Sequence, residues 1–163
     1  MKKYHFVFDN NKKNKKLKKI LLKKYKNSLP NLSYAIIVLG GDGFMLHALK
    51  RYQKFNKPFY GINCGTFGFL MNKYKNFNID KNITKAKLIS ITPLQMKVLT
   101  KTGKIYSAIA INEVSLLRQS RQTASLQITN GRKILITKLI SDGVLVSTPA
   151  GSTAYNLSVS GPI

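Results

Sequence analysis

Residues 34–43, YAIIVLGGDG, decide the fold of the first half of the chain. Their first six residues are apolar and rich in β-branched side chains, which is typical of a parallel strand covered on both faces. A turn of three glycines and one aspartate follows at once. The apolar residues Met45, Ala48, Leu49 and Tyr52 then recur at helical spacing, so a helix is predicted directly after the turn.

The neighbouring segments extend this unit on both sides. Residues 4–8 (YHFVF) give a short predicted strand, and residues 12–25 carry one apolar face among lysines, which indicates a helix. Residues 58–62 give a third strand. The order strand, helix, strand, helix, strand predicts an α/β domain with a doubly wound parallel sheet over residues 1–88.

After about residue 88 the pattern changes to short strands separated by turns. The predicted strands cover residues 91–99, 104–111, 114–118, 124–129 and 133–140. Asn130-Gly131 predicts a type I′ hairpin turn, which requires positive φ at both central residues. Residues 89–163 are therefore expected to form an all-β, sandwich-like domain that is incomplete in this chain.

The net charge of +23 admits two interpretations. Of the 28 basic residues only four are arginines, namely Arg51, Arg118, Arg121 and Arg132. Lys, Asn and Ile share A/T-rich codons, so genome composition accounts for much of the bias. A surface that reads phosphates would normally use arginine forks as well. A charge-driven polyanion partner stays open as the second interpretation.

Composition also bears on compartment and metal chemistry. The single cysteine, Cys64, excludes an internal disulfide, fits a reducing cytosol and is expected to be an inert core residue. One cysteine and two histidines argue against a His/Cys zinc site. No apolar run approaches the roughly 20 residues that span a bilayer, and no apolar signal-peptide region follows the first lysines. We therefore expect a cytoplasmic protein without a membrane partner.

Gly40-Gly41-Asp42-Gly43 is the first candidate site. Its glycines would let a phosphate approach the backbone amides at a helix N-terminus, and Asp42 would take a proton from an attacking hydroxyl. The alternative is a plain strand-to-helix turn with Asp42 as the N-cap. The segment is neither a Walker A loop nor a GxGxxG fingerprint. His47 lies one turn further on, where a solvent-facing helix residue is favoured over a catalyst.

Asn112-Glu113 is the second candidate site, because it interrupts an otherwise apolar stretch. A charged side chain inside a strand is costly to bury without a partner. The pair would supply amide groups and a carboxylate to ribose hydroxyls. The alternative is an edge strand or bulge with Glu113 facing solvent.

Residues 142–155, DGVLVSTPAGSTAY, form the most unusual segment. A predicted strand leads into a turn of small residues and a short helix that begins near Ser152 and ends at Gly161-Pro162. Hydroxyls and free amides at such a helix start suit the polar groups of a nucleotide, and Tyr155 would stack on or bond to a base. A Ser/Thr-rich turn with an N-cap is the alternative.

Together these segments resemble the NAD kinase family, and the resemblance covers the whole chain. Residues 40–43 resemble its GGDG loop, residues 61–70 its glycine-rich GxNxGxxGFL segment, and residues 112–113 its NE pair. Residues 142–163 resemble its DG…STPxGSTAYxLSxxGP stretch, which is long and specific, whereas GGDG also occurs in diacylglycerol and sphingosine kinases. Val159-Ser160 departs from the usual Ala-Gly, and Ala150 stands where some members have a hydroxyl residue.

The resemblance implies a role for each matching residue. Asp42 would accept the proton of the adenosine ribose 2′-hydroxyl of NAD and, with Gly43, contact NAD. Phosphates would lie along Gly40, Gly41 and Gly43, and the adenosine half of NAD would be held by Asn112 and Glu113. The residues that would line dinucleotide sites, some across a subunit contact, are Asp142, Thr153, Ala154, Tyr155 and Ser158. Weaker candidates are His47, Asn63 and Ala150.

The implied reaction transfers the γ-phosphate of ATP to NAD, giving NADP. Mg²⁺ would arrive on the nucleotide, since no protein-only metal cage is visible in the sequence. The expected partners are NAD, ATP and further copies of the chain in a dimer or tetramer, with no specific nucleic acid. Two other classes stay open: a GGDG kinase that acts on a lipid or small alcohol, and a basic non-enzyme that binds polyanions.

Members of the family continue well beyond residue 163, so the resemblance implies a chain truncated at its C-terminus. Leu126, Ile128, Ile134 and Ile136 alternate as if one face of the β region expects a partner layer. We expect such uncovered strands to promote aggregation or pairing between chains.

Overall fold

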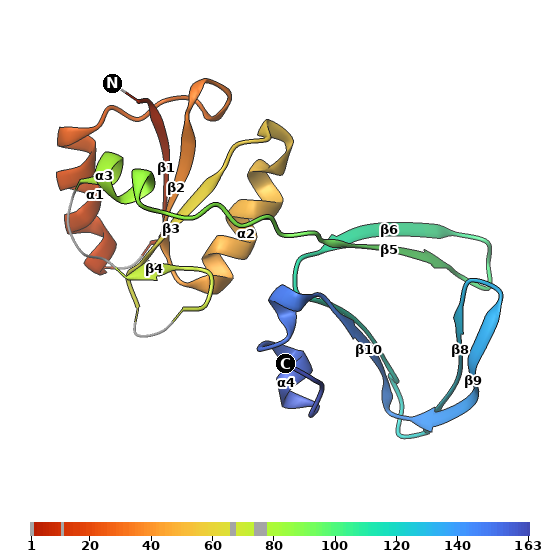
Figure 1. The fold of residues 1–163 in the computed structure, drawn as a ribbon. Helices are drawn as coiled ribbons and strands as arrows, with labels where there is room; N and C mark the ends of the chain where they lie inside the picture. Colours follow the sequence, from red (N-terminus) through yellow and green to blue (C-terminus); the bar gives the residue numbers. More distant parts are fainter. Residues whose placement is uncertain (1, 11, 66–67, 74–77) are drawn as a thin grey trace. The chain divides into compact units, whose positions relative to one another are not determined.

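The computed structural model describes residues 2–10, 12–65, 68–73 and 78–163, and divides the chain into two units, Met1–Ile89 and Ser90–Ile163 (Figure 1). The first unit alternates strands with helices. The second consists of strands followed by two short helical turns.

The first unit is built on one parallel sheet. Its strands follow the chain in the order β1 (Tyr4–Phe8), β2 (Ala35–Gly40), β3 (Phe59–Asn63) and β4 (Asn72–Lys73). Helix α1 (Lys12–Lys24) connects β1 to β2, and α2 (Asp42–Tyr52) connects β2 to β3. The predicted α/β class and parallel sheet are therefore confirmed, with β1 at its predicted bounds and β2 and β3 each shifted by one residue. The two-residue β4 was not predicted.

Alternate residues of β2 pack on opposite faces of the sheet. Ile37 and Leu39 belong to a cluster with Leu21 of α1, whereas Ile36 and Val38 pack with Met45 and its neighbours on α2. The side chains of residues 36–39 are all 0% exposed. Because both faces are covered, this apolar strand has the pattern of a central parallel strand.

A third helix, α3 (Ile79–Thr84), covers the same face of the sheet as α1. Tyr4 Oη donates a 2.6 Å hydrogen bond to Asp80 Oδ1, and Tyr25 Oη accepts one of 3.0 Å from the Ile79 amide. Burial, and then the bond to Asp80, raise the pKa of Tyr4. The sequence pattern missed α3 because six residues give less than two turns of periodicity. Two 3₁₀ turns, η1 (Pro30–Leu32) and η2 (Gln53–Phe55), complete the unit.

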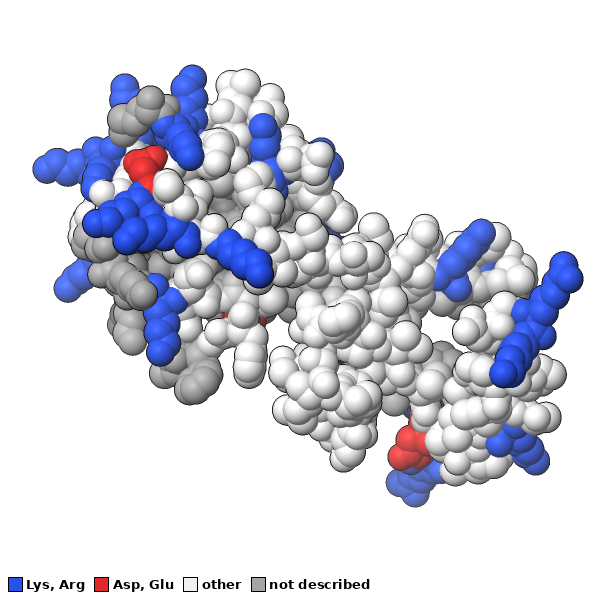
Figure 2. Space-filling view, viewed as in Figure 1, with Lys and Arg blue, Asp and Glu red and all other residues white. Residues whose placement is uncertain are grey.

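Basic side chains cover much of the first unit in the view of Figure 2, with few acidic ones among them. Helix α1 ends in Lys23 and Lys24, where positive charge is favourable next to the negative end of the helix dipole.

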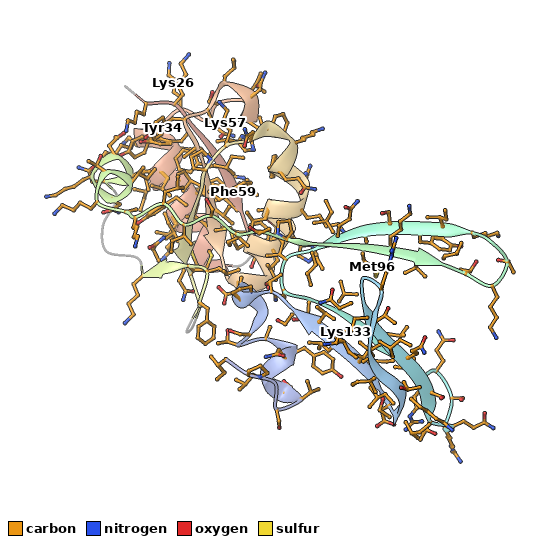
Figure 3. The ribbon with its side chains drawn as sticks, turned by 45° about the vertical axis from the view of Figure 1, so that its right-hand side comes forward. Lys26, Tyr34, Lys57, Phe59, Met96 and Lys133 are labelled. Carbon is orange, nitrogen blue, oxygen red and sulfur yellow. The ribbon has the colours of Figure 1, made fainter. Side chains whose placement is uncertain are left out.

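The second unit consists of three antiparallel strand pairs. The pairs are β5 (Leu94–Leu99) with β6 (Ile105–Ala110), β7 (Glu113–Leu117) with β10 (Gly143–Ser147), and β8 (Ala124–Asn130) with β9 (Lys133–Ser141). Figure 3 shows side chains projecting from these ladders, among them Met96 on β5 and Lys133 on β9. The all-β prediction for this region is confirmed.

The hairpin between β8 and β9 differs from the predicted turn. Asn130 pairs with Lys133, so the two central residues are Gly131 and Arg132. Of these, only Gly131 has positive φ, at 57°. The prediction of a type I′ turn centred on Asn130-Gly131 is therefore wrong. Glycine at the first central position is the pattern of a type II′ turn, which needs positive φ only there.

Candidate functional site

The glycine loop connects the carboxyl end of β2 to the start of α2. Gly41 is the N-cap in an extended conformation (φ −109°, ψ −177°), and Asp42 is the first helical residue. A Cβ at Gly40 would lie 2.8 Å from Phe44 Cδ1, whereas a Cβ at Gly41 or Gly43 would meet nothing within 4 Å. Gly40 is thus required by packing, and the backbone around the other two glycines is open to a ligand at a helix N-terminus.

Asp42 does not cap its helix. Its carboxylate instead accepts hydrogen bonds from two consecutive amides of the β3–β4 connection: Phe69 N to Oδ2 at 2.7 Å and Leu70 N to Oδ1 at 3.0 Å. The N-cap interpretation of Asp42 is therefore wrong. The two glycine-rich segments predicted from the sequence meet at this carboxylate, although Thr66 and Phe67 of the second segment lie outside the described residues.

The end of β3 lies beside the glycine loop. Asn63 pairs with Gly40, and its Oδ1 accepts a 2.8 Å hydrogen bond from the Gly65 amide. The Cys64 amide donates to the Gly40 carbonyl at 3.1 Å. The carboxyl ends of adjacent parallel strands are where ligands of open α/β sheets bind.

Cys64 and His47 have environments that match their structural interpretations. Burial, and then the negative charge of Asp9, raise the pKa of Cys64, so its thiol is kept in the unreactive protonated form. His47 is exposed on α2.

In the second unit, the Asn112-Glu113 pair lies against the start of the 147–151 turn. Glu113 opens β7 and pairs with Ser147, the last residue of β10. The Thr148 amide and Ser147 Oγ donate to the Asn112 carbonyl at 2.8 and 3.2 Å. A Cβ at Gly151 would lie 2.2 Å from that same carbonyl oxygen. The fold therefore joins two segments that are 35 residues apart in sequence into one junction.

Glu113 has a carboxylate oxygen without a partner. Its Oε2 is buried and makes no hydrogen bond in the described structure. An unpaired buried carboxylate oxygen is costly, and a hydroxyl donor from a ligand would remove that cost. The alternative in which Glu113 simply faces solvent does not fit this environment.

The segment after β10 forms two short turns. Thr148 caps η3 (Pro149–Gly151) by accepting the Gly151 amide at 3.0 Å, and α4 covers only Tyr155–Ser158. The predicted helix start near Ser152 is therefore three residues too early. Ala150, Thr153 and Ala154 are half-buried, whereas Tyr155 and Ser158 are exposed.

Asn156 shapes this segment and was missed in the sequence. Its buried side chain donates to the Ser152 and Pro162 carbonyls at 3.2 and 2.6 Å. A Cβ at Gly161 would lie 2.1 Å from Asn156 Oδ1. An amide residue shortly before a Gly-Pro turn was the available signal.

Asp142 lies at the other end of the β7–β10 ladder from Glu113. The ladder pairs Gly143 with Leu117 and Ser147 with Glu113, so five residues, or roughly 17 Å at about 3.4 Å per residue, separate Asp142 from that junction. Asp142 Oδ1 accepts from Arg118 Nε at 2.5 Å, and the Asp142 carboxylate is 75% exposed. Arg118 also donates to the Ser120 carbonyl. This ion pair was not predicted, because no sequence pattern relates residues 24 positions apart.

No three His, Cys, Asp or Glu side chains in the described part of the chain lie close enough together to hold a metal ion. Among the same residues, no helix is both long and apolar enough to cross a bilayer.

Comparison with known proteins identifies both units. Residues 2–86 match the family described as the ATP-NAD kinase N-terminal domain, and residues 111–163 match the ATP-NAD kinase C-terminal domain. The NAD kinase of Brucella suis is 45% identical over 159 residues, which cover 98% of this chain and 62% of that protein. The NAD kinase of Zymomonas mobilis is 53% identical over 132 residues, or 78% of this chain and 50% of its own length.

A solved structure has the same fold. The yeast NADH kinase, crystallised in complex with NADH, superposes with a TM-score of 0.80 at 21% identity, over 100% of this chain and 62% of that one. The chain thus spans between half and about three fifths of the length of these relatives.

Proposed function

The chain belongs to the ATP-NAD kinase family, and we propose that it carries out the family reaction, transfer of the γ-phosphate of ATP to the 2′-hydroxyl of the adenosine ribose of NAD. The observation that carries this proposal is the glycine loop. It presents a carboxylate, Asp42, beside backbone that is open at Gly41 and Gly43. Phosphoryl transfer needs little more from a protein than positioning and charge stabilisation, with a base for the attacking hydroxyl.

Asp42 is proposed as that base. It is only half-buried, so a ribose hydroxyl can reach it, and each of its oxygens accepts a hydrogen bond from one backbone amide. A carboxylate oxygen has room for a second hydrogen bond, which leaves a position for the 2′-hydroxyl. The phosphates would lie along Gly40, Gly41 and Gly43 at the start of α2, where amide groups and the helix dipole favour negative charge.

Asn112 and Glu113 are proposed to hold the adenosine ribose. The buried, unpartnered Oε2 of Glu113 supports this role, because a ribose hydroxyl is a donor of the kind it lacks. The hydrogen bonds from Thr148 and Ser147 fix the Asn112 backbone and so hold the pair in place.

The remaining candidates are proposed to line dinucleotide sites. Thr153, Ala154, Tyr155 and Ser158 follow the junction directly, and Ala150 lies within it. Asp142 is about 17 Å from that junction along the ladder, which supports a contribution to a site on another subunit of a homo-oligomer. His47 and Asn63 stay the weaker candidates near the glycine loop.

Mg²⁺ bound to ATP is proposed as the metal of the reaction, where it would offset the negative charge of the triphosphate. We also propose a cytoplasmic location and the domain limits 1–88 and 89–163.

The test is NADP formation from NAD and Mg-ATP, with sphingosine and diacylglycerol as competing acceptors. We expect phosphorylation of NAD alone. Phosphorylation of a lipid and not of NAD would favour the other GGDG kinases. Binding of DNA that weakens steeply with salt, without turnover of any acceptor, would favour a polyanion-binding protein.

A further inference from the structure

The Asp42 carboxylate is held by a part of the chain far from it in sequence. Phe69 and Leu70 lie 27 and 28 residues later, and their amides donate to different oxygens of the same carboxylate. A carboxylate that accepts from two consecutive amides is fixed both in position and in rotation. This matters at Asp42, because the glycines on either side of it leave its backbone little steric support.

The position of the Asp42 carboxylate leaves no space for a side chain at position 68. A Cβ at Gly68 would lie 2.9 Å from Asp42 Oδ1, and 3.1 and 3.2 Å from Cβ and Cγ of Met71. Gly68 is not among the glycines with positive φ, so backbone conformation does not require it. The carboxylate of Asp42 occupies the space that any larger residue at position 68 would need.

The two amides are themselves anchored in the core. Met71 follows Leu70 directly, is 8% exposed and packs in the cluster that contains Met45 of α2. A Cβ at Gly61 would lie 2.5 Å from Met71 Sδ and 2.6 Å from Met45 Cε, so both methionine side chains end over this glycine. The β3–β4 connection therefore contacts α2 at two points. Leu70 binds Asp42 at the start of the helix, and Met71 packs with Met45 further along it.

We infer that Gly68 and the Phe69 and Leu70 amides form a clamp that positions Asp42 for catalysis, with Gly68 as a positioning residue that does not touch substrate. The role in catalysis rests on the proposed function. Misplacement of a reacting group by about 1 Å costs on the order of 100-fold in rate. The clamp would keep Asp42 aimed at the ribose hydroxyl while its remaining lone pairs accept the proton.

The contact itself is tested without turnover, by amide hydrogen exchange on the full chain. We expect Asp42→Ala to lower the protection of the Phe69 and Leu70 amides by roughly 10–100-fold, as befits hydrogen bonds to a charged group. Gly68→Ala should lower it in the same direction with Asp42 still present. The matched control is Gly65→Ala, whose Cβ would only touch Asn63 Oδ1 at 3.5 Å and should leave both amides protected. Unchanged protection in both Asp42→Ala and Gly68→Ala would overturn the clamp.

The positioning role is tested by separating kcat from NAD affinity. Gly68→Ala should lower kcat by roughly 10–100-fold while the NAD dissociation constant changes by less than about threefold, because the clamp acts on the base and not on the substrate. A Gly68→Ala protein with lost protection and full kcat would overturn the positioning role. Absence of NAD turnover in the wild-type protein would refute the proposed function and this role with it, while hydrogen exchange would still decide whether the clamp exists.

Discussion

The two units of the chain differ in how far they bury the apolar side chains of their strands. In the first unit, residues 36–39 of β2 are wholly buried between helices. In the second, strands of similar composition leave Leu99 70%, Ile105 59% and Leu117 53% exposed. Both faces of a parallel sheet are buried by the chain itself, because the crossovers between its strands are usually helices that pack on the sheet. Antiparallel hairpins close with backbone hydrogen bonds alone and need a second layer from elsewhere.

The two candidate sites are held in place by different kinds of contact. Asp42 is fixed by a loop that is anchored in a closed core, through Met71 and Met45. The Asn112-Glu113 pair is held by hydrogen bonds to residues 147–151, with Thr148 and Gly151 as the buried residues of the junction. We therefore predict that changes in the first unit affect mainly turnover, whereas changes at Asn112-Glu113 affect mainly NAD binding.

The largest effect is expected when the base is removed. Asp42→Asn should lower turnover by roughly 10²–10⁴-fold, the usual contribution of a general base, with much less change in NAD affinity. Steady-state NADP formation and calorimetry of NAD binding measure the two quantities. Asp80→Asn is the control, since it removes a carboxylate of the same unit that contacts Tyr4 instead. Near wild-type turnover in Asp42→Asn would remove Asp42 from the mechanism.

The next effect concerns the uncovered face of the β8–β9 ladder. Ile136 is 40% exposed and pairs with Ile128, whereas a register shift pairs Ile134 with Thr129, so Ile134 does not share that face as the sequence pattern predicted. We expect the chain to self-associate through the face of Ile128 and Ile136, and Ile136→Lys to shift it towards smaller species in size-exclusion chromatography. The control is Thr129→Lys, which adds the same charge to the opposite face of the ladder. If Thr129→Lys acts equally, net charge and not the apolar face controls association.

A smaller effect is expected at the ribose-binding pair. Glu113→Ala should weaken NAD binding by about 1–3 kcal/mol, the cost of losing a hydrogen bond to a charged group. Calorimetry measures it, with Ser115→Ala, exposed on the same strand, as the control. Should Asp42→Asn weaken NAD binding more than Glu113→Ala does, the division of roles between the two units would be wrong.

The smallest effect tests the closed core. Tyr4→Phe removes the hydrogen bond to Asp80 and should cost about 0.5–1.5 kcal/mol of unfolding free energy at pH 7. Folding raises the pKa of Tyr4, so the stability it contributes is present below the ordinary tyrosine pKa of about 10 and is lost as pH rises beyond it. Urea unfolding at pH 7 and 10.5 should therefore show a smaller alkaline loss in Tyr4→Phe than in wild type. Tyr106→Phe, at a 56% exposed tyrosine of the second unit, is the control and should behave as wild type.

Where periodicity was long, the sequence was a good guide to the fold. The buried strand before Gly40 and the apolar face of α2 lie where residues 34–52 predicted them. Helix α3 was not predicted and the start of α4 was predicted wrongly, because both helices are too short to show a helical periodicity. The type I′ turn at Asn130 was wrong because register decides which residues become central in a turn, and the Asn130–Lys133 pairing moved it by one residue.

The sequence by itself determined the chemistry available to this chain: one aspartate among glycines, one glutamate in an apolar strand, and a long segment typical of the family. Only the tertiary structure decided which of these groups act together. It brought the Phe69 and Leu70 amides to Asp42, joined Asn112 to Thr148, and left Asp142 at the far end of its ladder with Arg118. The physical reason is that local patterns fix strands and helices, whereas contacts across tens of residues follow from sheet register and close packing.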